Sequence, residues 1–182
     1  MISCSRASKL LICGLEVGLR LFICGFSGAG KSTLGREVAT RLKTSFIDTD
    51  EALAEGEILA DRIESWGWSK FRQLEAEMIM RLSGGLKGDE MVISLGGGAL
   101  SEAVVHATKH KGNALAWLDT SFEECWSRIE GDSSRPLTLK GKDELARLYD
   151  ERLPLYAQAN IRVSGTAAVD ELVSYVASFN RG

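Results

Sequence analysis

A glycine-rich stretch near the amino terminus, GFSGAGKST at residues 25–33, combines backbone freedom with one fixed positive charge. Gly25, Gly30, Lys31 and Ser32 satisfy the pattern G-x-x-x-x-G-K-[ST]. An apolar run precedes the stretch and a helical pattern follows it, which is the strand–loop–helix context of a phosphate-binding loop. The stretch therefore predicts that the chain binds a nucleoside triphosphate. A plain glycine turn is the alternative.

The residue types of this loop suit the tail of a triphosphate. Glycines allow successive backbone N–H groups to turn inward around phosphate oxygens, and the N-terminus of the following helix adds partial positive charge. The lysine can reach the β- and γ-phosphates, and the serine hydroxyl is a ligand for Mg²⁺. We expect the nucleotide to contact Gly28, Ala29, Gly30, Lys31, Ser32 and Thr33.

Two carboxylates follow the next apolar run, in the segment FIDTD. We expect Asp48 and Asp50 to point the same way, because they are two residues apart in what the pattern predicts to be extended chain. Ligands of open α/β sheets bind beyond the carboxyl ends of the strands, so both carboxylates are expected to face the γ-phosphate. One can hold Mg²⁺ or its water, and the other can accept a proton from an alcohol. An acidic turn at the end of the strand is the alternative.

A second group of residues could form an acceptor site. In FRQLE, Arg72 and Glu75 are spaced i, i+3 on a predicted helix. Such a pair on a surface contributes only about 0.2–0.5 kcal/mol, but the glutamate could instead hold the arginine in one orientation for a substrate carboxylate. In SLGGGAL, Gly96, Gly97 and Gly98 follow an apolar run. A simple turn would need one glycine, so three in succession predict close approach of a ligand to the backbone.

Composition narrows the class of protein. The chain has 182 residues, of which 45% are hydrophobic and 26% are charged, so it can bury the core of one domain. Its net charge of −3 argues against a nucleic-acid partner and favours small ligands. The four cysteines lack C-x-x-C spacing, which fits buried thiols in a reducing, cytoplasmic setting.

Residues 1–18 are predicted to be an extension of unassigned role, ahead of a single domain at 19–182. The apolar stretch that begins there is interrupted by Glu16 and Arg20 and is far shorter than the roughly 20 residues of a membrane span. We therefore expect neither a secretory signal nor a membrane segment.

The elements that position these residues follow an α/β rhythm, in which apolar runs alternate with stretches of helical period. Short continuous apolar runs are typical of a parallel sheet that is covered on both faces. A helix is predicted from about Ser69, as N-cap, to Leu82. The polar segment at 130–143 is predicted to be an exposed, mobile loop. Strands are expected at 20–24, 45–48, 91–95, 114–118 and 160–164.

Six motifs, in this order and spacing, resemble those of the shikimate kinase family: GFSGAGKST, FIDTD, FRQLE, SLGGGAL, SRPLT and ERLPLYAQA. The likeness covers residues 20 to about 180. It implies a three-layer P-loop kinase fold, in which helices flank a five-stranded parallel sheet, with a mobile lid at about 130–143 and a small helical substrate-binding subdomain at about 49–83. It also implies transfer of the γ-phosphoryl group of MgATP to the 3-hydroxyl of shikimate, by a cytoplasmic enzyme that we expect to be a monomer.

The resemblance also implies roles for the residues nearest the phosphates. Lys31 would bind phosphate oxygens during catalysis, and Ser32 would bind Mg²⁺. Asp48 would hold the metal through a water molecule. Asp50 would contact the acceptor hydroxyl as general base or hydrogen-bond acceptor. Arg135 would enter from the lid to meet the phosphoryl group as it transfers, and it would also contact ATP.

The remaining roles concern the acceptor and the adenine. The resemblance implies that Arg72 and Arg152 clamp the carboxylate of shikimate and that Glu75 orients Arg72. Gly96, Gly97 and Gly98 would line the substrate pocket, and Arg128 would stack near adenine. From the residues alone, Arg152 is equally a surface arginine of a helical stretch.

Two departures from the family pattern concern the acceptor side. Where the family usually has Gly-Glu before the Phe-Arg pair, this chain has Gly67-Trp68, and the segment from Asp50 to Arg72 is slightly short. RPLT also stands at 135–138 in place of the commoner RPLL. Two alternatives therefore stay open: a kinase for another small hydroxy acid or a nucleotide, and a protein that binds nucleotide without turnover.

Overall fold

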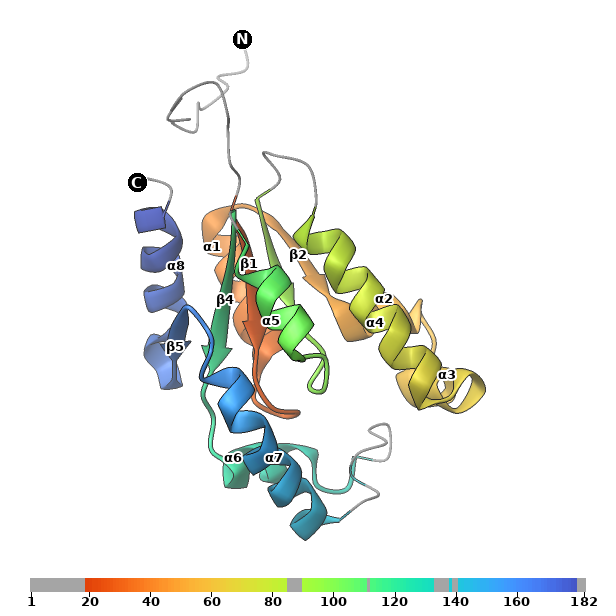
Figure 1. Ribbon diagram of the computed structural model, residues 1–182. Helices are drawn as coiled ribbons and strands as arrows, with labels where there is room; N and C mark the ends of the chain where they lie inside the picture. The colour runs from red at the N-terminus through yellow and green to blue at the C-terminus, as the bar shows by residue number, and fades with distance from the viewer. Residues whose placement is uncertain (1–18, 85–89, 111, 133–137, 139–140, 180–182) are drawn as a thin grey trace.

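A computed structural model describes residues 19–84, 90–110, 112–132, 138 and 141–179 (Figure 1). The five strands found in this part of the chain form one parallel sheet with the order β2-β3-β1-β4-β5. All of β1 is buried, so an uninterrupted apolar run suits this central place. The strands are β1 (Arg20–Cys24), β2 (Ser45–Asp48), β3 (Met91–Ser94), β4 (Asn113–Leu118) and β5 (Ile161–Val163).

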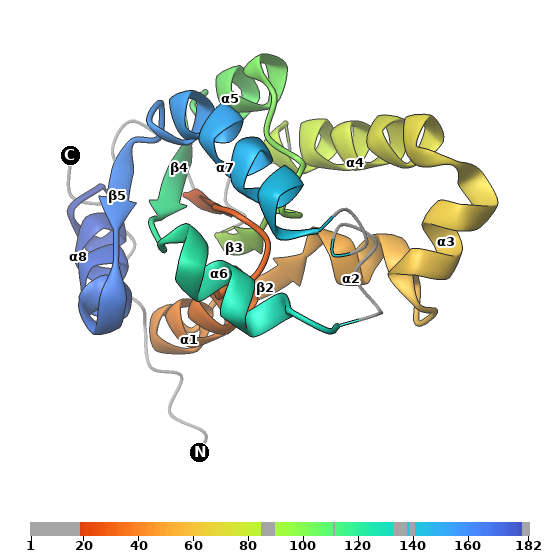
Figure 2. The same ribbon diagram turned by 90° about the horizontal axis from the view of Figure 1, so that it is seen from below.

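Helices cover both faces of the sheet, as Figure 2 shows from below. Alternate residues of β1 point to opposite faces: Leu21 and Ile23 join one core cluster, whereas Phe22 and Cys24 join the other. The first cluster includes residues of α1 and α8, and the second includes residues of α4 and α5. The α-helices are α1 (Lys31–Leu42), α2 (Thr49–Ala54), α3 (Leu59–Trp66), α4 (Trp68–Ser83), α5 (Glu102–Thr108), α6 (Phe122–Ile129), α7 (Lys142–Tyr156) and α8 (Ala168–Phe179).

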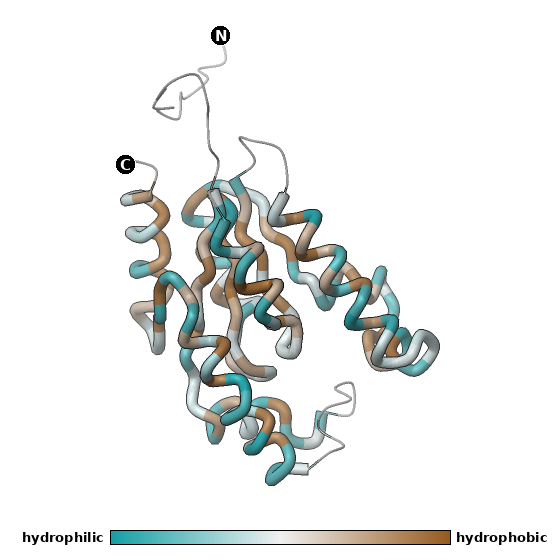
Figure 3. Tube along the Cα trace, viewed as in Figure 1, coloured by the Kyte–Doolittle hydropathy of each residue, from teal (hydrophilic) through white to brown (hydrophobic). Residues whose placement is uncertain are grey.

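The path of α7 matters for the site, because this helix crosses from one core cluster to the other beyond the carboxyl ends of the strands (Figure 1). Leu145 near its start is fully buried in the first cluster. Tyr156 at its end is buried in the second. Figure 3 shows hydrophobic residues along the central strands, whereas hydrophobic and hydrophilic residues alternate along the helices around them.

A smaller core lies outside the sheet, among α2, α3 and α4. Leu53, Ile63 and Phe71 are buried there, one from each helix. Figure 1 shows α3 at the end of α4 that is remote from β3. Because α4 also contributes Ile79 to the second large cluster, it joins this helical group to the sheet.

The predicted five-stranded parallel sheet flanked by helices is confirmed, with strand limits that differ by one residue at most. The predicted N-cap Ser69 is wrong. Trp68 already begins α4 and Gly67 is the N-cap, because its φ of 76° lets the chain reverse direction there at no steric cost. Residues 1–18 lie outside the described part, as do 133–137, 139 and 140 of the expected loop. No helix within the described ranges is long and apolar enough to cross a membrane.

Asn113 fixes the ends of two helices against the sheet. This buried residue begins β4, and its side-chain amide donates hydrogen bonds of 3.0 Å to the carbonyl oxygens of Ser83 and Ala107, at the ends of α4 and α5. An amide group suits this place, because it offers two N–H donors to two partly buried carbonyl acceptors.

We expect Asn113→Asp to lower the free energy of unfolding by about 2–4 kcal/mol at pH 7, because a buried carboxylate would face two carbonyl oxygens without donors. Urea denaturation measures the change. Asn113→Ala removes the same hydrogen bonds without adding charge and should cost less. The loss for the aspartate variant should shrink toward pH 4, since burial raises the pKa of the new carboxyl and its protonated form can donate. A cost that does not depend on pH would contradict this account.

Candidate functional site

The phosphate-binding loop connects β1 to α1 through backbone conformations that only glycine adopts easily. Gly28 has a φ of 82°, and Gly30, which precedes α1, has a φ of 101°. A Cβ atom at Gly28 would lie 2.5 Å from the carbonyl oxygen of Cys125 and 2.9 Å from the Ile129 side chain. The loop is therefore shaped both by its own backbone and by the close packing of α6 against it.

Lys31 is buried at the start of α1, and its ammonium group donates a 2.9 Å hydrogen bond to the carbonyl oxygen of Phe26. Burial lowers the pKa of this amine, against the attraction of Asp50 and Asp48, which raises it. A desolvated cation that is only partly compensated by carboxylates favours an anionic ligand. The geometry thus fits the phosphate contact that the sequence predicts for Lys31.

Ser32 and Asp48, both predicted to hold Mg²⁺, lie in contact, since the hydroxyl donates to the carboxylate at 2.5 Å. Asp48 is also the N-cap of α2, where its other carboxylate oxygen accepts from the backbone N–H groups of Asp50 at 2.9 Å and Glu51 at 3.3 Å. The capping bonds fix the carboxylate in place. The expectation that Asp48 and Asp50 share one extended strand is wrong, because α2 begins at Thr49 and Asp50 lies in its first turn.

Neighbouring groups approach Gly96, Gly97 and Gly98 so closely that a Cβ atom at any of the three would lie 3.0 Å or less from one of them. A Cβ atom at Gly96 would collide with the carboxylate oxygens Oδ1 of Asp50 and Oε1 of Glu75. At Gly97 it would lie 3.0 Å from the backbone nitrogen of Ser27, in the phosphate-binding loop. The sequence predicts close approach of a ligand here, whereas the structure shows that protein groups also converge on the segment.

Two guanidinium groups meet at Gly98. A Cβ atom there would collide with the guanidinium group of Arg72 and would lie 3.0 Å from Nη2 of Arg152. Arg72 comes from α4 and Arg152 from α7, so elements remote in sequence bring the two arginines together. A pair of forked donors is suited to bidentate recognition of a carboxylate.

Glu75 holds Arg72 through an ion pair of 2.5 Å between Oε2 and Nη1. Only 2% of the Glu75 side chain is exposed, whereas 34% of the Arg72 side chain is. Burial raises the pKa of the Glu75 carboxyl, and the adjacent Arg72 lowers it. Its second oxygen, Oε1, is buried and has no hydrogen-bond partner among the described residues. Oε1 and Asp50 Oδ1 both face Gly96, so carboxylate oxygens from α4 and α2 meet at this glycine.

Arg152 is fixed by the backbone and by an aromatic ring. Its Nη1 donates to the Gly97 carbonyl oxygen at 2.6 Å, and its guanidinium carbon lies 5.6 Å from the centroid of the Phe26 ring. The hydroxyl of Tyr156, one turn further along α7, donates to the same carbonyl at 3.4 Å. Arg152 thus lies beside these site residues. A surface arginine, which was the alternative, would lie on the outer face of the helix.

Arg128 lies against the phosphate-binding loop. Its Nη1 donates to the carbonyl oxygens of Gly28 at 3.1 Å and Ala29 at 3.0 Å. About half of its side chain is exposed, and Nη2 lies 3.6 Å from a carboxylate oxygen of Glu124. The structure therefore places Arg128 on the nucleotide side of the site. Arg135 lies outside the described residues.

Sequence reasoning missed three residues that hold the site together. The Thr49 hydroxyl accepts a 2.9 Å hydrogen bond from the Gly96 N–H. The ring of Phe26 packs against Tyr149 of α7, with centroids 5.3 Å apart. Tyr156 contacts Gly97, as described above. Of the three, only Tyr156 had a recognisable pattern in the sequence, its spacing of four from Arg152. The contacts of Thr49 and Phe26 join distant parts of the chain, which no local pattern predicts.

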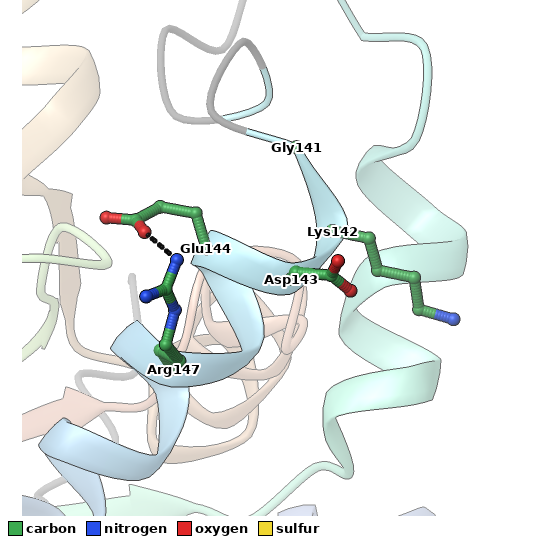
Figure 4. A pocket seen from close by; sticks show the side chains of 5 residues that line it. All are labelled: Gly141, Lys142, Asp143, Glu144 and Arg147. Carbon is green, nitrogen blue, oxygen red and sulfur yellow. Dashed lines mark hydrogen bonds and ion pairs between the residues drawn. The ribbon is translucent and has the colours of Figure 1, made fainter.

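A separate hollow of about 420 Å³ lies at the start of α7 (Figure 4). It is lined by Gly141, Lys142, Asp143, Glu144 and Arg147. Arg147 pairs with Glu144 at 2.7 Å, as the dashed line shows. None of the predicted site residues lines this hollow, and its Lys142 pairs with Glu123 of α6.

Comparison with known proteins gives a consistent family. The family model described as shikimate kinase matches residues 27–179. A shikimate kinase from Persephonella marina is 36% identical over 146 residues, which cover 79% of this chain and 87% of that protein. A shikimate kinase from Novosphingobium aromaticivorans is 35% identical over 172 residues, which cover 92% of this chain and 88% of that protein.

A solved structure agrees with the sequence comparisons. The shikimate kinase from Acinetobacter baumannii, in complex with shikimate, is similar to this chain with a TM-score of 0.77 and 26% identity. The similarity covers 90% of this chain and 93% of that one. The fold is therefore shared along 90% of this chain.

The packing of α6 against the phosphate-binding loop can be tested at Gly28. We expect Gly28→Ala to lower the free energy of unfolding by about 2–4 kcal/mol, because the methyl group meets a backbone carbonyl and the φ is positive. Gly131→Ala is the matched control, since its φ of 76° is similar but nothing lies within 4 Å of its Cβ position. That change should cost only about 1 kcal/mol. Equal costs in urea denaturation would show that backbone strain alone matters.

Proposed function

The chain belongs to the shikimate kinase family, and from this premise we propose that it transfers the γ-phosphoryl group of ATP to the 3-hydroxyl of shikimate. One observation carries the assignment of the site. Arg72 and Arg152 meet at Gly98, one residue beyond the contact of Gly97 with the phosphate-binding loop. A carboxylate held by the two arginines would therefore lie beside the terminal phosphate of a nucleotide in the loop.

The nucleotide half of the site uses groups of fixed position. Backbone N–H groups at residues 28–33 and the ammonium group of Lys31 bind the phosphates. Arg128 approaches from the outer side of the loop, where the adenine would lie. From its place in the sequence, we assign Arg135 of the lid to the same group of phosphate-binding cations. Most of the catalysis in such a transfer comes from positioning and from neutralising charge on the phosphoryl oxygens.

The Ser32 hydroxyl and the Asp48 carboxylate fit Mg²⁺. Hard oxygen ligands are what this ion prefers, and in kinases it takes one or two of them from the protein and the rest from water and phosphate. The 2.5 Å contact between the two groups supports their assignment to one metal centre. When bound, Mg²⁺ would neutralise charge on the triphosphate.

The acceptor half of the site orients the alcohol. We assign Arg72 and Arg152 to the carboxylate of shikimate, and Glu75 to the orientation of Arg72 through their ion pair. Asp50 accepts a hydrogen bond, and then the proton, from the hydroxyl that attacks the γ-phosphorus. Gly96, Gly97 and Gly98 leave the room that these contacts require.

We also infer the domain limits, the oligomeric state and the cellular location of the enzyme. We assign residues 19–182 to one kinase domain, with α2, α3 and α4, at about 49–83, as its substrate-binding part and about 130–143 as its lid. All the assigned groups come from one chain, so a monomer would suffice. Use of ATP fits the cytoplasm. There the free thiols of Cys24 and Cys125 would stay reduced; burial raises their pKa to about 12 and about 11, so both remain protonated at neutral pH.

A coupled assay of ADP release tests the function. We expect ADP to form from ATP only when shikimate and Mg²⁺ are both present, and Lys31→Met to lower kcat roughly a hundredfold or more, because a preorganised cation is lost from the phosphoryl group. Lys109→Met is the matched control, since this lysine is exposed at the C-terminal end of α5, outside the assigned site and lid. Nucleotide binding without ADP release from the wild type would overturn the proposal.

The carboxylate clamp has its own test on α7. We expect Arg152→Ala to raise the KM for shikimate about tenfold to a hundredfold, because charge-assisted hydrogen bonds to the carboxylate are lost, and to change the KM for ATP little. Arg147→Ala, on the same helix but paired with Glu144 away from Gly98, should leave both constants unchanged. If the two variants behave alike in steady-state assays, Arg152 is not part of the clamp.

A further inference from the structure

Trp68 is an exposed aromatic residue beside the candidate acceptor site. It is the first residue of α4, and 41% of its surface is exposed. The small core of α2, α3 and α4 does not include it, although that core includes the neighbouring Phe71. Core packing therefore does not account for the indole at this position.

The indole lies over the guanidinium group of Arg72. The carbon Cζ of Arg72 is 5.2 Å from the centroid of the Trp68 ring and 5.3 Å from that of Phe71. Residues four apart on a helix lie on one face, and a cation within about 6 Å of an aromatic centroid is attracted to the ring. The two rings meet edge to face, with an interplanar angle of 88°, so Phe71 fixes the orientation of the indole.

Arg72 is thus held by two kinds of contact. The buried Glu75 carboxylate binds Nη1, and the aromatic rings bind the guanidinium group as a whole. The group Nη2 is the one that reaches the Cβ position of Gly98, beside Arg152. An arginine held only by Glu75 could still rotate about that ion pair, because one third of its side chain is exposed to water.

We propose that Trp68 is a positioning residue for the acceptor carboxylate, which it serves by holding Arg72 against Gly98. This inference rests on the proposed function. The residue does not contact reacting atoms, so it should affect the affinity for the acid substrate and leave the chemical step and the nucleotide alone.

The chain contains a matched control pair. The guanidinium group of Arg62 lies 4.9 Å from the ring centroid of Trp66, in the same helical group. Arg62 forms ion pairs with Glu55 at 2.7 Å and with Glu57 at 3.0 Å, and neither Arg62 nor Trp66 is among the groups that approach Gly96, Gly97 or Gly98. A change at Trp66 therefore alters an arginine–tryptophan contact that takes no part in the site.

The test compares steady-state constants for Trp68→Ala, Trp68→Leu, Trp68→Phe and Trp66→Phe. We expect alanine and leucine at position 68 to raise the KM for shikimate about three- to tenfold, with kcat and the KM for ATP little changed. Phenylalanine at 68 should restore most of the affinity, because it keeps an aromatic face, whereas leucine keeps only apolar bulk. Trp66→Phe should match the wild type.

Fluorescence gives a second measurement that a merely structural role would not alter. Addition of shikimate should change the tryptophan emission of the wild type, and this change should be lost in Trp68→Phe and kept in Trp66→Phe. Normal turnover by the wild type together with an unchanged KM in both Trp68→Ala and Trp68→Leu would overturn the inference alone. Absence of turnover by the wild type would overturn the proposed function, and this inference with it.

Discussion

The site depends on the absence of three side chains at the end of β3. Gly96 admits the carboxylates of Asp50 and Glu75, Gly97 lies against Ser27 of the phosphate-binding loop, and Gly98 lies between two arginines. Any residue with a Cβ atom would push at least one of these groups away. The three glycines lose conformational entropy on folding, which is the cost of bringing both halves of the site to one short segment.

The charges of the site are arranged so that each half is incomplete without an anion. Burial lowers the pKa of the Lys31 amine, and the attraction of Asp50 and Asp48 offsets this lowering only in part. Arg72 binds Glu75 through Nη1, and its Nη2 lies beside Gly98. Phosphate at the lysine and carboxylate at the arginine would each restore the balance. The geometry therefore suits a ligand pair that is anionic at both ends.

Sequence reasoning reached the sheet and the phosphate-binding loop because both have local signals. Continuous apolar runs mark buried parallel strands, and the loop is a contiguous motif. The errors arose where one residue decides the backbone. Asp48 caps α2 and so ends the strand before Asp50, and Gly67 caps α4 two residues ahead of Ser69. The contacts of Thr49 and Phe26 join distant segments, and no local pattern predicts them.

The same distant contacts couple the two halves of the site mechanically. Phe26 lies in the phosphate-binding loop, and its carbonyl oxygen accepts a hydrogen bond from Lys31. Its ring packs against Tyr149 and lies under the guanidinium group of Arg152, both of α7. Arg152 in turn binds the Gly97 carbonyl, whose residue lies against Ser27. This closed set of contacts joins the phosphate-binding loop to Arg152 of α7. Arginine suits this place better than lysine, because its five donors in a fixed plane can keep the backbone contact while binding a carboxylate.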